Sequence, residues 1–189
     1  MIALLWIVPG IIVIAVLWLW GSYNGLVRAR IAVKNAWAQI DVQLKRRWDL
    51  IPNLVETVKG YKDFERSTLE AVTKARASAQ QAGSAPIADR AKAEGELSAA
   101  LGRLMVVVER YPELKANQNF LALQEELTGT ENRISFSRQA YNDSVLQYNN
   151  KTQQVPSNIV ASMFNFTKEQ EFLQATESEA EKKAPKVSF

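Results

Sequence analysis

The residues in this chain that are best suited to chemistry are carboxylates on predicted helices. Glu65, Glu94 and Glu131 fall close to the apolar stripes of three helices. Inward-facing Glu residues hold two metal ions in some four-helix bundles, but those sites also use Glu-x-x-His motifs. The chain has no histidine. We therefore predict that these carboxylates pair with arginines across the helices, with a carboxylate metal site as the alternative. The arginines predicted as partners are Arg76, Arg133 and Arg138.

Few residues of this chain suit other kinds of catalysis. The absence of cysteine and histidine excludes disulfides, thiolate nucleophiles, the usual zinc sites and histidine acid–base catalysis. There is no GxGxxG, GxxxxGK[ST] or GxSxG motif. The formal net charge is only +3 and both signs are interspersed, so no nucleic-acid partner is expected. The sequence predicts no catalytic, cofactor-binding or metal-ligating residue and therefore no enzyme. The alternative is a membrane-associated enzyme with a carboxylate site in the bundle.

The element that must position everything else is the first apolar segment, Ile2–Trp20, which carries no charge. As a helix it would span roughly 28 Å, close to the hydrocarbon core of a bilayer. Trp6, Trp18 and Trp20 lie near its ends, where aromatic rings favour the membrane interface. No Lys or Arg precedes the segment and no small-x-small cleavage pattern follows it, which favours a permanent anchor over a cleaved signal peptide. Residues 1–21 are predicted to be a single transmembrane anchor that contacts the bilayer through residues 2–20.

The charges after the span predict its orientation. Arg28, Arg30 and Lys34 follow it with no acidic residue among them. The positive-inside rule then places the rest of the chain in the cytoplasm. A periplasmic or extracellular location is the alternative. Either way, a membrane is the expected location.

The stretch from Ala36 to Tyr61 contains two helical stripes. Trp37, Ile40, Leu44 and Trp48 share one helix face. Pro52 follows, and because proline disfavours helical geometry in the preceding residue, we predict a break there and a second helix over 52–81. The run 45–47, Lys-Arg-Arg, is interpreted as a solvated helix end, with binding of acidic lipid or of a partner as the alternative.

Two further helices complete the predicted domain. Pro86 begins the third, and Asn117 or Asn119 is the predicted N-cap of the fourth. The buried stripe predicted for the third helix is Ala91, Glu94, Leu97, Leu101, Leu104 and Val108. The seam predicted for the fourth helix, close to that of a coiled coil, is Phe120, Leu123, Leu127, Thr130, Ile134, Ser137, Tyr141, Val145 and Tyr148. The fold class is therefore all-α, a transmembrane helix that continues into an antiparallel four-helix bundle over 22–166. The alternative has three long helices, with a kink at Pro52.

The end of the chain changes character twice. Residues 155–166 are apolar and aromatic, and with four antiparallel helices they would emerge beside the bilayer. We predict that they lie on the membrane surface or cap that end of the bundle, with an ordinary cap without lipid contact as the alternative. Residues 167–189 are polar and charged and are predicted to be a disordered tail.

Three stretches resemble a known family. They are IDVQLKRRWDLIPNLVETVKGY, TENRISFSRQAYNDSVLQYN (Thr130–Asn149) and VPSNIVASMFNF (Val155–Phe166). They are similar to the signature of the LemA family of bacterial membrane-anchored helical proteins. The resemblance implies an anchored bundle and no established activity. The predicted function is a membrane-anchored scaffold or interaction protein of the bacterial envelope, located in the inner membrane. The expected partners are membrane or envelope proteins and further copies of this chain.

Overall fold

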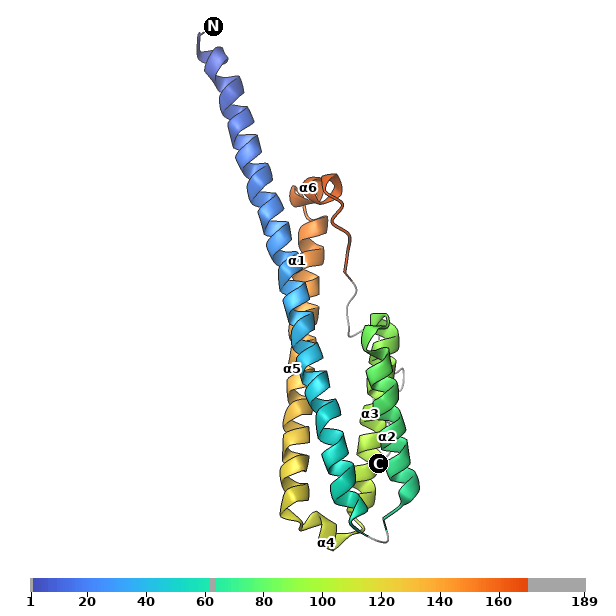
Figure 1. The fold of residues 1–189 in the computed structure, drawn as a ribbon. Coiled ribbons are helices and arrows are strands. Elements are labelled where there is room, and N and C mark those ends of the chain that lie inside the picture. Colours follow the sequence, from blue (N-terminus) through green and yellow to red (C-terminus); the bar gives the residue numbers. More distant parts are fainter. Residues whose placement is uncertain (1, 62–63, 170–189) are drawn as a thin grey trace, which may run out of the picture. The chain divides into compact units, whose positions relative to one another are not determined.

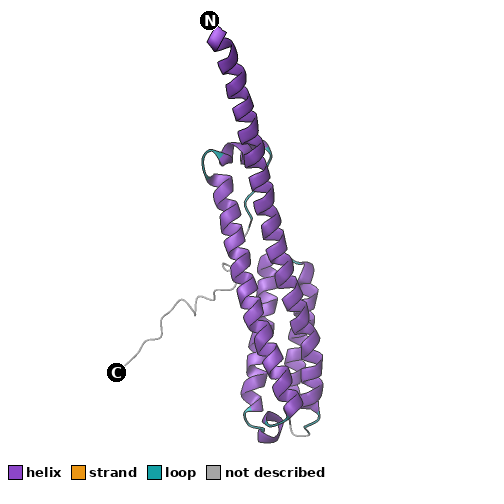
Figure 2. Ribbon diagram, turned by 90° about the vertical axis from the view of Figure 1, so that its left-hand side faces the viewer, coloured by secondary structure: helices purple, strands orange, loops and turns teal. Residues whose placement is uncertain are grey.

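A computed structural model describes residues 2–61 and 64–169. These residues form helices and short connections and contain no strand (Figure 2). The elements are α1 (Ile2–Lys59), α2 (Arg66–Gln81), the 3-10 helix η1 (Ala82–Ser84), α3 (Ile87–Val108), α4 (Pro112–Lys115), α5 (Gln118–Gln153) and α6 (Ser157–Met163). Figure 1 labels the α-helices. The all-α prediction is confirmed. The chain divides into two compact units, the first containing Met1–Trp37 with Ala140–Glu171 and the second containing Ala38–Gln139.

The predicted helix break at Pro52 is wrong. α1 runs through this position without interruption and ends at Lys59, so the predicted second helix does not begin at residue 52. The chain turns instead between α1 and α2, and α2 begins at Arg66. The alternative, in which Pro52 lies inside one long helix, is correct at this position, but that helix ends at Lys59 and α2 is a separate helix.

A side chain from α2 explains how α1 accommodates Pro52. Proline has no N–H, so the carbonyl four residues earlier loses its usual helical donor. That carbonyl belongs to Trp48, and it accepts a hydrogen bond from Arg76 Nε at 2.7 Å. Pro52 itself is exposed, so its ring faces solvent. The contact supplies the missing donor and holds α2 against α1.

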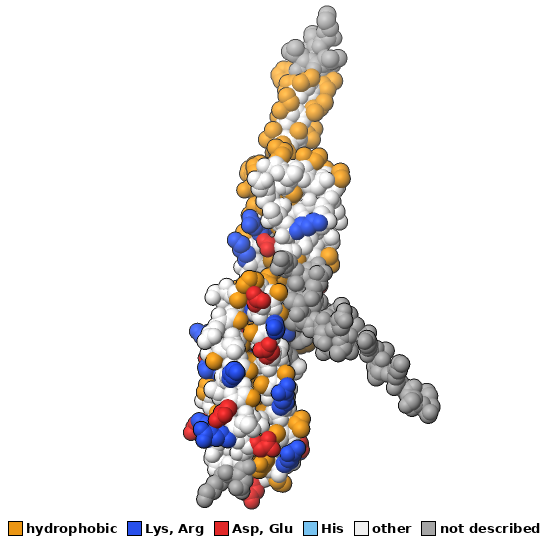
Figure 3. Space-filling view, turned by 90° about the vertical axis from the view of Figure 1, so that its right-hand side faces the viewer, with side chains coloured by type: hydrophobic (Ala, Val, Ile, Leu, Met, Phe, Trp, Pro, Cys, Tyr) orange, Lys and Arg blue, Asp and Glu red, His pale blue; other side chains and the backbone are white. Residues whose placement is uncertain are grey.

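The first unit contains the apolar N-terminal stretch of α1. Within the part of the chain that the structure describes, α1 is the one helix long and apolar enough to cross a membrane. Residues 6–20 are exposed except for Leu19, which is half-buried. Figure 3 shows these hydrophobic side chains, with no charged side chain among them on the visible face. Farther along α1, Leu26 and Val33 are buried.

The C-terminal part of α5 packs within this unit. Tyr141, Val145 and Tyr148 are buried, as the seam predicts, and the rings of Trp37 and Tyr141 lie 5.1 Å apart. The chain after α6 is hydrogen-bonded to α5. Tyr148 Oη donates to the Thr167 carbonyl at 2.9 Å. The predicted disordered tail otherwise falls on residues 170–189, which lie outside the described residues.

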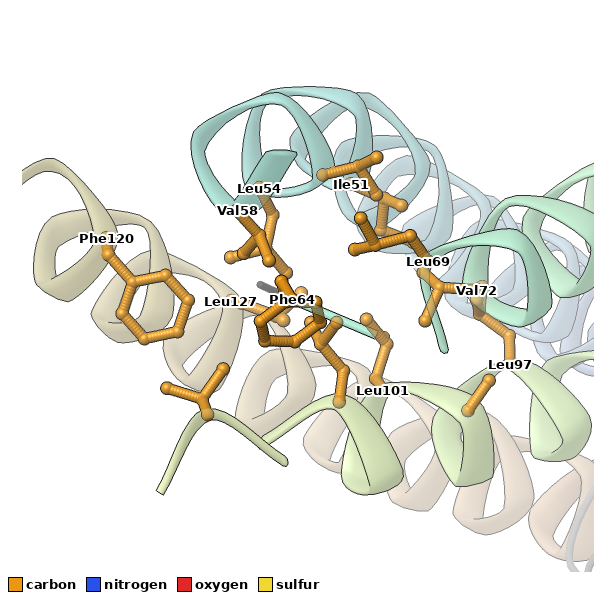
Figure 4. Close-up of a cluster of buried hydrophobic side chains, with 14 of the residues drawn as sticks. Ile51, Leu54, Val58, Phe64, Leu69, Val72, Leu97, Leu101, Phe120 and Leu127 are labelled. Atoms are coloured by element: carbon orange, nitrogen blue, oxygen red, sulfur yellow. The ribbon is translucent and has the colours of Figure 1, made fainter. Parts of the chain in front are cut away.

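In the second unit, α1, α2, α3, α5 and the short α4 contribute to one apolar core (Figure 4). Ile51, Leu54 and Val58 of α1 face α2 and α3 in this core, where Leu69 and Val72 meet Leu97 and Leu101. Phe120 and Leu127 extend the core to α5, and Phe64 comes from the turn between α1 and α2. All six residues of the stripe predicted for the third helix are buried.

The start of α5 follows the predicted cap. Asn117 Oδ1 accepts hydrogen bonds from the N–H groups of Asn119 at 2.9 Å and Phe120 at 3.1 Å. These two amides are among the four at a helix start that have no carbonyl partner in the helix itself. Of the two predicted caps, Asn117 is therefore the correct one.

Candidate functional site

One buried arginine joins three helices through the predicted carboxylates. Arg47 of α1 and Glu94 of α3 form an ion pair, and both side chains are 0% exposed. Nη1 of Arg47 also donates to Glu131 Oε1 of α5 at 2.7 Å and to Ser98 Oγ at 2.9 Å. Glu94 Oε1 accepts a further hydrogen bond from Trp48 Nε1 at 3.1 Å. We call Arg47, Glu94, Glu131, Ser98 and Trp48 the buried polar network.

A second arginine lies within electrostatic reach of the network. Burial lowers the pKa of Arg138, the positive charge of Arg47 lowers it further, and the negative charge of Glu131 opposes both effects. The ion pairs of Arg47 with Glu94 and Glu131 allow these charges to remain inside a helical core, where an isolated charge is very costly.

The geometry explains why the network is poorly suited to catalysis. Glu94 has no exposed surface, and Arg47 and Trp48 already occupy its oxygens. Glu131 is 38% exposed but also engaged by Arg47. Glu65 does not join them. It lies on the surface, where its Oε1 is 3.4 Å from Arg110 Nη1. Among the described residues, no group of three or more Asp and Glu side chains could hold a metal ion.

The expected pairing of Glu131 with a positive charge on another helix is confirmed, but the partner is Arg47. Arg47 was not among the predicted partners, and the prediction of Arg76 as a partner is wrong. Arg76 binds the Trp48 carbonyl instead. The interpretation of residues 45–47 as a solvated helix end is also wrong for Arg47. A signal existed in the sequence, because Arg47 lies on the helix face of Leu44 and Ile51 at spacings of 3 and 4.

A second buried arginine, Arg90, was also not predicted from the sequence. Arg90 of α3 is 4% exposed, forms an ion pair with Asp41 of α1 and donates to the Gly83 carbonyl at 3.0 Å. It precedes Ala91, the first residue of the predicted stripe, so it stands at the edge of the apolar face. Its partners are distant in sequence and no local pattern identifies them. Both arginines therefore stabilise contacts between α1 and α3.

A surface groove of about 670 Å³ lies between α1 and α2. Apolar side chains, including Val55, Phe64 and Leu69, line it together with the cationic side chains of Lys59 and Lys74. In this lining the Thr73 hydroxyl donates to the Leu69 carbonyl at 2.9 Å and Glu70 pairs with Arg66 at 2.8 Å, so the groove provides a surface for contact more readily than a site for chemistry.

The first unit presents a different candidate surface. α6 packs beside α1 (Figure 1), with Val160 and Ala161 buried against Leu26 and with Leu19 at the edge of this cluster. Tyr23 of α1 makes edge-on ring contacts with Phe164 and Phe166, at centroid distances of 4.8 and 5.8 Å.

The end of α6 follows from a single residue. Asn165 has φ of 53°, a left-handed conformation that asparagine adopts more readily than most residues. Phe166 N–H then donates to the Ala161 carbonyl at 2.9 Å, and Asn165 N–H donates to the Ser162 carbonyl at 3.4 Å. This is the hydrogen-bond pattern of a Schellman motif. It turns Phe166 back onto the cluster around Leu26.

The outer side of this segment is apolar. We define the α6 patch as the exposed hydrophobic residues of 155–164, each of which has more than half of its surface exposed. They are Val155, Ile159, Met163 and Phe164. Phe166 does not belong to the patch, because it is half-buried against the cluster around Leu26.

Comparisons with known proteins identify one family and several more distant relatives. The family model described as "LemA family" matches residues 36–189. Protein LemA of Metamycoplasma hominis is 27% identical over 144 residues, which covers 75% of this chain and 64% of that protein. Magnetosome protein MamQ 1 of Paramagnetospirillum magneticum is 25% identical over 174 residues, covering 79% and 64%. MamQ of Magnetospirillum gryphiswaldense is 24% identical with the same coverage. The chain thus spans about 64% of the length of these curated relatives.

Proposed function

The chain belongs to the LemA family, and from this we propose that it is a membrane-anchored helical scaffold or interaction protein of the bacterial cell envelope. The observation that carries the proposal is the exposed, charge-free surface of residues 6–20 of α1. A stretch with this composition is unstable in water and stable in a bilayer. The magnetosome names of two relatives are consistent with a membrane setting.

We infer that the second unit is an antiparallel four-helix bundle. The connections from α1 to α2 and from α2 to α3 are short, which favours antiparallel neighbours. Core residues from α1, α2, α3 and α5 meet in a single cluster. A bundle of this kind is a rigid support with long outer surfaces, which is what a scaffold requires.

The proposed partners are envelope or membrane proteins, and further copies of this chain, rather than nucleic acid. A photo-crosslinking amino acid at Val106 or Phe136, which are exposed apolar positions, tests this in living cells. We expect discrete adducts in the membrane fraction. Leu97, which is 0% exposed, is the matched control and should give none. A lack of adducts at every exposed position tested would contradict a role in binding partners.

The competing function is an enzyme that uses the buried carboxylates. The ion pairs of Glu94 and Glu131 with Arg47 argue against it, because both carboxylates already have a counter-charge. Elemental analysis of the purified full-length protein provides the test. We expect no metal in stoichiometric amount. A stoichiometric metal that is lost in a Glu131→Gln variant would favour the enzyme.

The orientation is proposed from Arg28, Arg30 and Lys34, which follow the span. Since the chain has no cysteine, a single Ser84→Cys substitution provides a unique label at an exposed turn. We expect a membrane-impermeant thiol reagent to label it only after the cells are permeabilised. Labelling in intact cells would place the bundle outside the cytoplasm.

A further inference from the structure

We propose that the α6 patch lies in the membrane interface and binds lipid directly, as a second membrane contact beside the α1 anchor. This inference rests on the proposed membrane anchoring of α1. It concerns only the first unit, in which α6 and the N-terminal part of α1 pack together.

The level of α6 along α1 is the first argument. A span over residues 2–21 fills the roughly 30 Å hydrocarbon core at 1.5 Å per residue. Leu26 then lies about 7.5 Å beyond the end of the span, within the headgroup layer. α6 packs on α1 between Leu19 and Leu26. Its exposed face is therefore at the depth where surface helices bury their apolar side.

The distribution of charge is the second argument. No charged residue occurs in 2–27 of α1 or in 152–167 around α6. These two charge-free stretches meet where Leu26 contacts Val160 and Ala161. Charge begins immediately beyond them, at Arg28 on α1 and at Lys151 and Lys168 on either side of α6. Charged residues thus mark the boundary of the uncharged zone on both α1 and the α6 segment.

The cations at this boundary suit a lipid surface. Arg28 and Arg30 follow Leu26, the α1 residue that packs against α6, by two and four positions, and α1 has no acidic residue before Asp41. Arg28 Nε donates to the Asn24 carbonyl at 3.2 Å, so its side chain reaches back along α1 toward the span. An arginine that extends toward a membrane in this way is positioned for lipid phosphates.

Aromatic residues of α1 lie at the same level as the α6 patch. Trp18, Trp20 and Tyr23 of α1 are exposed, and Phe164 of the α6 patch contacts the Tyr23 ring. Aromatic rings with an apolar body and a polar edge that contacts water favour the membrane interface. Lipid accounts for this combination better than a protein partner, because the patch is continuous with the lipid-facing surface of the anchor.

Depth-dependent fluorescence quenching tests the proposal on the full-length protein. An environment-sensitive fluorophore is attached to the introduced cysteine of an Ile159→Cys or a Met163→Cys variant. The labelled protein is then reconstituted in vesicles of phosphatidylcholine and phosphatidylglycerol. Some of the lipids bear a nitroxide at the headgroup or on the acyl chain. We expect a blue shift at both positions and the loss of most of the emission with nitroxides placed high on the acyl chain.

Two further positions make the outcomes distinguishable. Leu146→Cys is the matched control, an exposed apolar position on α5 in the same unit, and its probe should keep its emission. Ile12→Cys reports on the anchor and should be strongly quenched. Quenching at Ile12 without quenching at Ile159 and Met163 would overturn the lipid contact alone. A blue shift at those positions without quenching would show a protein cover. No quenching at Ile12 would overturn both the anchor and this inference.

Discussion

Removing the positive charge at the centre of the buried polar network should destabilise the fold in a pH-dependent way. In Arg47→Met the substituted side chain still fills the apolar part of the site, but Glu94 loses its counter-charge while both positions have no exposed surface. Removing one member of a buried pair costs about 3–5 kcal/mol. The loss has an upper limit, because the carboxyl group can bind a proton instead of remaining charged.

The size of that limit follows from the pH. Protonating a carboxyl group whose unfolded pKa is about 4.3 costs about 1.36 kcal/mol per pH unit, which is about 3.7 kcal/mol at about pH 7. At about pH 5 the same cost is about 1 kcal/mol. The folded variant then binds one proton more than its unfolded chain above the unfolded pKa, so its stability falls as the pH rises. We therefore expect the deficit to shrink by about 2.7 kcal/mol between about pH 7 and about pH 5.

Guanidinium unfolding of the full-length protein in mild detergent, followed by circular dichroism, measures both values. Arg46→Met is the matched control, because Arg46 pairs at 2.7 Å with Glu126 while the two side chains are 45% and 44% exposed. It should cost at most about 1 kcal/mol. Its cost should be the same at both pH values. Adding Glu94→Gln to Arg47→Met should restore most of the stability, since glutamine is neutral and keeps an oxygen for Trp48. A deficit for Arg47→Met that matches the control, or that does not change with pH, would refute the reasoning.

Three further predictions concern single contacts. Asn117→Ala should lower the unfolding free energy by about 1 kcal/mol through loss of the cap, whereas Asn117→Asp should retain it, as thermal unfolding can measure. Arg76→Met should cost about 1 kcal/mol more in the natural sequence than in a Pro52→Ala background, where the restored amide can bond to the Trp48 carbonyl, and a double-mutant cycle measures this coupling. Burial and, secondarily, the charge of a nearby carboxylate raise the pKa of Tyr141 to about 12. The folded state therefore holds this proton longer than the unfolded state, and up to about 2.7 kcal/mol of stability should be lost from about pH 10 to about pH 12. Unfolding at alkaline pH should show a smaller loss in Tyr141→Phe.

The parts of the fold that were predicted correctly depend on local pattern. The stripe from Ala91 to Val108 repeats at the helical period, and every member is buried. The seam of α5 is buried at most of its positions, although Thr130 stands where a larger apolar residue would be expected. Its hydroxyl bonds to the Glu126 carbonyl at 2.8 Å, one turn earlier in the same helix. Periodicity alone therefore identifies the faces that become the core.

The parts that were missed depend on contacts between distant residues. Pro52 carries a strong local signal for a break, but Arg76 supplies a donor from another helix and the break does not occur. Arg47 looks like part of a basic surface run, yet Glu94 and Glu131 neutralise it from α3 and α5. In both cases a side chain from another helix offsets a cost that the local sequence imposes. Such compensation cannot be deduced before the helices are placed.

Membrane retention is the most direct test of the central claim that α1 anchors a helical scaffold to the membrane. Cells expressing the full-length protein are fractionated, and the membranes are washed with alkaline carbonate, which removes peripheral proteins. We expect the natural chain to remain in the membrane pellet and a variant with Ile12→Lys and Ile14→Lys, two exposed positions in the span, to be released. Release of the natural chain, or retention of both proteins, would contradict anchoring through α1.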